Sequence, residues 1–134
     1  MKKYLLLIIA CLLLVGCGSK NENEVLPPED DTKIITLFEH EKYKDLALDN
    51  IDYCEVIRFT VAGDMRKTIS ETEEIATLYN ELKNVKIGKE TNRACEDNTT
   101  VYRFVLKDGT ATSVEFECDW VIIGTKRYEI VKNN

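Results

Sequence analysis

Apolar and polar side chains alternate along the segment that begins at Ile51. Apolar residues recur there at even spacings, namely Ile51, Tyr53, Ile57, Phe59 and Val61. Asp52, Arg58 and Thr60 fall on the other set of positions, so the pattern predicts a strand with one buried face. Gly63-Asp64 is a turn-forming pair, and it predicts a hairpin that leads to a second short strand over residues 65–69.

The apolar spacing then changes from two residues to three and four. Ser70-Glu71-Thr72-Glu73 matches a capping box, in which the Ser and Glu side chains each bond to the other residue's backbone amide. The apolar positions that follow are Ile75, Leu78, Tyr79, Leu82 and Val85. Asn84 and Gly88 are residues typical of a helix end. The sequence therefore predicts an amphipathic helix that starts at Ser70.

A second hairpin turns at Lys107-Asp108-Gly109, and its register follows from the sorting of side chains between the two faces. A two-residue Asp-Gly loop would place the apolar residues before the turn on the same face as Glu115 and Glu117. A type I turn with Gly109 as a bulge pairs Leu106 with Thr110 instead. This register, which we predict, collects Tyr102, Phe104, Leu106, Val114, Phe116 and Cys118 on one face.

The last predicted hairpin joins residues 120–123 to residues 126–131 through Gly124-Thr125. Gly at the first loop position suits a type II′ turn. The segment 34–48 is apolar but follows neither period, and we interpret it as a short helix. The predicted order is therefore β-β-α-β-β-β-β, an α+β domain whose antiparallel sheet packs on one amphipathic helix.

The first 17 residues have the pattern of a secretory signal peptide. Lys2 and Lys3 precede an apolar run that is shorter than the roughly 20 residues of a spanning helix. Leu14-Val15-Gly16-Cys17 resembles the lipobox of bacterial lipoproteins, in which the Cys is diacylated and becomes the mature N-terminus. Cys11 fits the same pattern, but cleavage there would leave too short an apolar run. The resemblance implies that lipidated Cys17 anchors the chain on the extracytoplasmic face of the cell membrane.

We therefore expect three parts along the chain. Residues 1–16 are the signal peptide, residues 17–33 are the lipidated N-terminus and a disordered polar tether, and residues 34–134 form a single extracytoplasmic domain. The layout of that domain resembles small uncharacterised lipoproteins of Gram-positive bacteria. The segments that carry the resemblance are YCEVIRFTV, SETEEIATLYNEL, YRFVLKDGT and RYEIV. The resemblance covers residues 51–131 and implies no activity and no functional residue.

The charge of the chain narrows the range of partners. The 134 residues include 18 Lys and Arg against 24 Asp and Glu, a net charge of −6. Loss of the signal peptide would remove Lys2 and Lys3 and leave 16 basic residues against the same 24 acidic ones, or −8. An acidic domain is not expected to bind nucleic acid, because phosphate contacts require a positive surface. We expect the acyl chains, not surface charge, to hold it at the membrane.

Besides the lipidated Cys17, three cysteines would remain after processing, namely Cys54, Cys95 and Cys118. At most one intrachain disulfide can form among them. Cys118 is predicted on the core face of its strand, whereas Cys95 lies in a loop three or four positions out of register with it. We therefore favour buried or unreactive thiols over the alternative, a disulfide between Cys95 and Cys118.

The sequence has no strong catalytic or metal-binding pattern. It has neither a C-x-x-C nor an H-x-x-x-H pair, and its one histidine, His40, is interpreted as solvated. The helix cap accounts for Ser70, and no serine stands in a G-x-S-x-G motif. We expect no catalytic residue, no metal and no cofactor.

Three carboxylates alternate near the end of one strand, at Glu115, Glu117 and Asp119. Paired carboxylates can act in acid-base chemistry or bind a cation. We favour the interpretation that they form a charged outer face, with Arg103 and Lys107 as cross-strand neighbours.

The predicted registers place Trp120 and Ile122 opposite the core face, beside Arg127. Because Trp and Arg dominate binding hot spots, these three residues are our candidates for a partner-binding face. The alternative is that residues 34–48 fold over this face and bury it.

The leading hypothesis is a non-catalytic, lipid-anchored domain that binds a protein or another envelope component. An inhibitor or immunity-type lipoprotein is the alternative, and an envelope enzyme is the third candidate. A chain of this size is short for a two-lobed solute receptor, and it lacks the paired nucleophile and base of a hydrolase.

Overall fold

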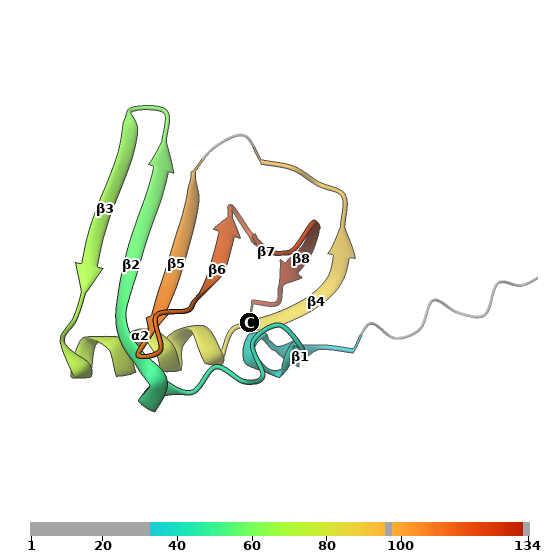
Figure 1. Cartoon of the computed structure of the whole chain (residues 1–134). Helices are drawn as coiled ribbons and strands as arrows, with labels where there is room; N and C mark the ends of the chain where they lie inside the picture. Colours follow the sequence, from blue (N-terminus) through green and yellow to red (C-terminus); the bar gives the residue numbers. More distant parts are fainter. Residues whose placement is uncertain (1–32, 96–97, 133–134) are drawn as a thin grey trace, which may run out of the picture. The chain divides into compact units, whose positions relative to one another are not determined.

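A computed structural model describes residues 33–95 and 98–132 (Figure 1). In chain order it contains β1 (Ile35–Thr36), the 3-10 helices η1 (Leu37–Glu39) and η2 (Leu48–Asn50), β2 (Ile51–Thr60), β3 (Gly63–Ile69), α2 (Thr72–Lys83), β4 (Lys86–Thr91), β5 (Thr99–Leu106), β6 (Ala111–Glu117), β7 (Trp120–Ile123) and β8 (Lys126–Ile130). The predicted signal peptide, the lipidation site Cys17 and nearly all of the predicted tether lie outside the described residues.

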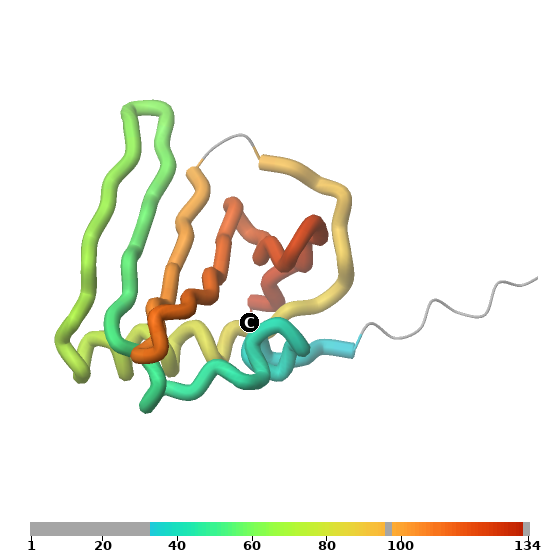
Figure 2. Tube along the Cα trace, viewed as in Figure 1, coloured from blue at the N-terminus to red at the C-terminus, as the bar shows by residue number. Residues whose placement is uncertain are grey.

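The strands of the described part form one antiparallel sheet in the order β1-β4-β8-β7-β6-β5-β2-β3. The β2–β3 hairpin forms one side of the sheet and β4 with β1 the other, and α2 runs across one end of the strands (Figures 1 and 2). The predicted α+β class, an antiparallel sheet with one helix, is therefore confirmed.

The order of the elements differs from the prediction, because β1 and β4 add to the predicted strands. Ile87 is the one buried residue of β4, and its other positions are half-buried or exposed. The strand therefore has no alternating apolar pattern. β1 has only two residues, too few for a period to be recognised.

The register of the β5–β6 hairpin is confirmed. Tyr102 lies opposite Val114 and Phe104 opposite Thr112. At the turn, the Leu106 amide donates to the Thr110 carbonyl at 2.8 Å, and Gly109 has φ +85°. Positive φ is strained for a residue with a Cβ, which explains glycine at the bulge. The β7–β8 turn likewise has Gly124 at φ +66°, as a type II′ turn requires.

The predicted buried face of β2 is wrong beyond its first residue. The register shifts between Ile51 and Tyr53, so a bulge at this point inverts the faces of the residues that follow. Cys54 consequently lies opposite buried Phe104 in the core, while Tyr53, Ile57 and Phe59 turn to the other face. The hairpin turn lies at residues 61–62 instead of Gly63-Asp64, and Val61 is 95% exposed there.

The prediction of a short helix over residues 34–48 is also wrong. This segment forms β1, η1, a series of turns and then η2. Four of its irregularly spaced apolar residues are buried in the core, namely Leu37, Phe38, Tyr43 and Leu46, whereas Ile34 is exposed. A regular helix would direct these side chains to different sides, so packing overrides local periodicity.

The helix α2 has the predicted apolar face but a different start. Ile75, Tyr79 and Leu82 are buried in the main core. The N-cap residue is Glu71 and it forms no side-chain cap bond, so the capping box predicted at Ser70 is wrong. Asn84 is the C-cap residue, as predicted, and its amide donates to the Asn80 carbonyl.

Candidate functional site

One face of the sheet carries the candidate binding residues. In β7 and β8, Trp120 lies opposite Glu129 and Ile122 opposite Arg127. Val121 and Ile123 point to the other face, where both are buried in the core. Following the registers across the sheet, the face with the indole also carries Ile57, Val101, Glu115 and Glu117. We call this surface the Trp120 face.

The segment 34–48 does not cover the Trp120 face. Leu37, Phe38, Tyr43 and Leu46 belong to the core cluster that includes Val121 and lies on the opposite face. The Tyr79 hydroxyl of α2 donates a hydrogen bond of 2.8 Å to the Leu46 carbonyl, which links this segment to the helix. Trp120 is half-buried and Ile122 likewise. Within the described residues, the predicted alternative, in which residues 34–48 fold over the Trp120 face and bury it, is therefore wrong.

Two arginine-carboxylate pairs hold the surface of the Trp120 face in place. Arg127 Nε donates to Glu117 Oε2 at 2.7 Å, and Arg103 donates to Glu55 at 2.6 Å. Glu117 is only 8% exposed, so the carboxylate of the first pair is largely shielded from water, while the Arg127 side chain is 32% exposed. Charge-assisted bonds of this kind fix side-chain geometry. Arg127 is thus ordered in place, with its guanidinium already engaged by Glu117.

The neighbours predicted for the three alternating carboxylates are partly wrong. Glu115 and Glu117 do share the Trp120 face, but Asp119 lies in the β6–β7 turn and pairs with Lys132 at 2.8 Å. Arg103 pairs with Glu55 on the neighbouring strand. Lys107 donates to the Asp49 carbonyl at 2.7 Å. Glu55 was missed because the bulge in β2 places it on this face.

Glu115 occupies the middle of an apolar row. Val101 lies directly opposite it on β5 and Ile122 directly opposite it on β7. Ile57 continues the row on β2 and is buried. Among the described residues, no side chain forms a hydrogen bond or an ion pair with the Glu115 carboxylate. A half-buried carboxylate between apolar residues favours a cationic group from outside.

A shallow hollow of about 220 Å³ borders the indole. It is lined by Arg93, Asp119, Trp120, Glu129, Ile130 and Lys132. The structure joins Cys95 to Cys118 by a disulfide, with 6.3 Å between their Cα atoms. This bond ties the loop that carries Arg93 to the turn before Trp120. It therefore contributes to the shape of one end of the Trp120 face.

Cys118 does not lie on the core face, where it was predicted. It is exposed in the two-residue turn between β6 and β7 and has φ +53°. The strand ends one residue earlier than its alternating pattern suggested. Cys54 is the free and buried thiol of the described part, and burial raises its pKa to about 11. A thiol with so high a pKa is a poor nucleophile at neutral pH.

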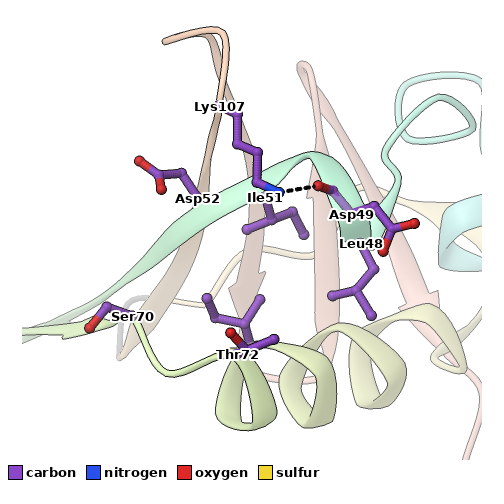
Figure 3. A pocket seen from close by; sticks show the side chains of 8 residues that line it. Leu48, Asp49, Ile51, Asp52, Ser70, Thr72 and Lys107 are labelled. Carbon is purple, nitrogen blue, oxygen red and sulfur yellow. Dashed lines mark hydrogen bonds between the residues drawn. The ribbon is translucent and has the colours of Figure 1, made fainter.

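A second hollow, of about 550 Å³, lies where β2 begins and α2 starts (Figure 3). Ile51, Leu48 and Ile75 form its apolar side, and Asp49, Asp52, Ser70, Thr72 and Lys107 its polar side. The Lys107 amine donates to a backbone carbonyl of the same hollow, as the dashed line in Figure 3 shows. No nucleophile and base are hydrogen-bonded to each other among these residues, so the hollow has the features of a polar surface groove.

Metal-binding groups are also dispersed in the described part of the chain. No three His, Cys, Asp or Glu residues lie close enough there to hold an ion. His40 is half-buried instead of fully solvated, with its ring 5.8 Å from that of Tyr128. Its Nδ1 accepts a hydrogen bond from the Lys42 amide at 3.2 Å.

Comparisons with known proteins add no homologue. No protein-family model, curated protein or solved structure matches the chain. Within the described residues, no helix combines the length and apolar character needed to cross a membrane. The lipoprotein resemblance of the N-terminal residues therefore stays a prediction from the sequence.

Proposed function

We propose that the protein is a lipid-anchored, extracytoplasmic domain that binds a protein partner through the Trp120 face and catalyses no reaction. One observation supports this proposal above the others. A face with half-buried Trp120, Ile122 and Val101 lies outside the main core cluster, while the opposite face is packed against α2 and residues 37–46. Partly exposed Trp beside ordered Arg is typical of binding hot spots.

The charge of the same surface favours a partner that presents a basic side chain. Glu115 offers a carboxylate without an ion-pair partner in the described part, and it is flanked by Val101 and Ile122. The net charge of −6 would also steer a basic protein toward the domain. A basic residue between apolar neighbours would match this row.

The partner test uses capture from solubilised membranes of the source cells with the tagged full-length chain. Trp120→Ala and Glu115→Gln are expected to reduce recovery of the captured protein. The first removes the large apolar side chain of the Trp120 face, and the second removes the carboxylate that would bind a basic side chain of the partner. Ile34→Ala is the matched control, since Ile34 is 55% exposed and lies outside the Trp120 face. Equal recovery with all four chains would overturn the proposal.

Direct contact can be followed without a label, because Trp120 is the one tryptophan of the chain. Addition of the captured protein should shift the tryptophan emission and reduce its quenching by acrylamide. Unchanged quenching in a complex that demonstrably forms would place the partner elsewhere. A partner that is a harmful external protein, inactivated on binding, would favour the inhibitor or immunity alternative.

The anchor is tested separately at Cys17. Cys17→Ala should abolish incorporation of labelled palmitate and leave an uncleaved precursor, because the acyl acceptor is missing. Cys11→Ala is the control and should be processed normally. Normal labelling of the Cys17→Ala chain would refute the lipid anchor and leave the binding face untouched.

A further inference from the structure

Strand β3 is an open edge of the sheet. It pairs with β2 on one side, and no described segment pairs with its other side (Figures 1 and 2). Outside the β2–β3 ladder, its backbone forms no backbone hydrogen bond to the described residues. The strand has seven residues, an edge of roughly 24 Å. The opposite edge, β1, has only two residues.

Exposed apolar side chains gather on the same hairpin. The described part exposes four large apolar side chains, and three of them, Phe59, Val61 and Met65, lie on β2, β3 or the turn between them. Met65, the third of the seven residues of the edge strand, is 66% exposed. A long open edge with exposed apolar residues favours pairing with another strand.

We propose that the strand pairing with β3 is β3 of a second copy of this chain. The two strands run antiparallel about a two-fold axis that passes through Met65. Such an interface is closed and self-complementary, as in most homodimers. The inference does not rest on the proposed function, because β3 and Trp120 lie on different parts of the sheet.

The charges of β3 select this register. With the axis at Met65, Asp64 of each copy lies opposite Arg66 of the other, and opposite charges on facing positions stabilise a sheet. Lys67 lies opposite Gly63, which has no side chain to clash with it. An axis at Arg66 or Lys67 would place two like charges face to face, which is destabilising.

The remaining contacts fit the same arrangement. Asp64 and Arg66 lie opposite Phe59 and Ile57 of β2, so both belong to the side of the sheet that carries the Trp120 face. The two Met65 side chains meet on the other side, at the axis. Lys67 approaches Glu74 of its own chain at 3.8 Å, which reduces its repulsion toward a second copy. The two Trp120 faces then point in one direction.

Cysteine cross-linking of the full-length chain in detergent tests the register. Met65→Cys places two thiols at the axis, so mild oxidation should give a covalent dimer. Arg66→Cys and Lys67→Cys are the matched controls, and they should give several-fold less dimer because their thiols are offset from the axis. Stronger cross-linking at position 66 or 67, or none at position 65, would overturn the proposed pairing.

A charge swap tests the contact between Asp64 and Arg66 in sedimentation experiments. Asp64→Arg and Arg66→Glu should each weaken the dimer by about tenfold, since each variant faces like charges twice. Mixing the two variants should restore dimers, because every facing pair is then of opposite charge. A wild-type chain that stays monomeric, or one whose edge pairs with a different protein, would refute the inference. Trp120→Ala should leave dimerisation unchanged.

Discussion

The Tyr43 hydroxyl donates a hydrogen bond of 3.0 Å to the backbone carbonyl of Ser113. β7 pairs only with residues 115–117 of β6, so the first half of β6 has no neighbour on that side. Tyr43 reaches this gap from the turns between η1 and η2 and is only 1% exposed. A side chain from the irregular segment thus satisfies a backbone group that the sheet leaves open.

Burial makes the stability of the domain sensitive to alkali. It raises the pKa of Tyr43 from an ordinary 10.0 to about 12, with a smaller contribution from the nearby charge of Glu115. Because the folded pKa is the higher one, the protonated phenol contributes stability that is complete below about pH 10. That contribution is lost as the pH rises through about 12. The pKa of Cys54 is likewise raised, from 9.0 to about 11. The stability that its protonated thiol contributes is therefore lost as the pH rises through about 11.

The first prediction follows from this window. Tyr43→Phe should cost about 1 kcal/mol at pH 7, because the Ser113 carbonyl loses its donor. Between pH 10 and 12 the variant should lose less stability than the wild type, by a slope of at most about 1.4 kcal/mol per pH unit. Urea unfolding across this range measures both effects. Tyr53→Phe, which alters the opposite face, is the control, and equal slopes for Tyr43→Phe and wild type would contradict the prediction.

The sequence predicted those parts of the fold in which local pattern and tertiary packing agree. The β5–β6 register could be predicted because only one alignment separates Phe104 and Val114 from Glu115. The faces of β7 and β8 followed in the same way, which placed Trp120 and Arg127 correctly. These elements have short turns whose glycine positions fix the pairing.

Other parts of the fold depend on contacts between strands, which the residue pattern of one strand alone does not predict. The bulge after Ile51 reverses the faces of β2, yet nothing in the alternation of Tyr53, Ile57 and Phe59 signals it. The gap beside Ser113 likewise exists only in the assembled sheet, so the role of Tyr43 could not be predicted from spacing. Glu55 and Arg103 become a pair only because the bulge brings Glu55 to the outer face.

The start of α2 gives a second prediction. Glu71 is the N-cap residue, with φ −72° and ψ 126°, and its side chain makes no cap bond. Ser at this position has the preferred side chain for the same backbone geometry. Glu71→Ser should therefore raise the free energy of unfolding by about 1 kcal/mol. Ser70→Ala should leave the free energy of unfolding unchanged in the same denaturation experiment. A lower free energy of unfolding for Ser70→Ala would mean that Ser70 does cap the helix.

The disulfide gives a third prediction. Cys95 and Cys118 are 23 residues apart, and a bond over this separation stabilises a fold by about 3 kcal/mol. Cys95→Ser breaks the bond without altering Cys118, whose positive φ would complicate a substitution there. Wild type in dithiothreitol should unfold at the same urea concentration as Cys95→Ser, and reductant should not affect the variant. Cys54→Ala is the control that keeps the response to reductant.

The fourth prediction compares aromatic residues on the two faces of the sheet. Phe104 is fully buried in the core, and Phe104→Ala should cost about 3 to 5 kcal/mol. Trp120 is larger but half-buried on the uncovered face, so Trp120→Ala should cost only about 1 kcal/mol, since less of its surface leaves water on folding. Chemical denaturation of both variants measures the difference. A loss at Trp120 equal to that at Phe104 would mean that another part of the chain covers the indole, and the Trp120 face would then be no binding surface.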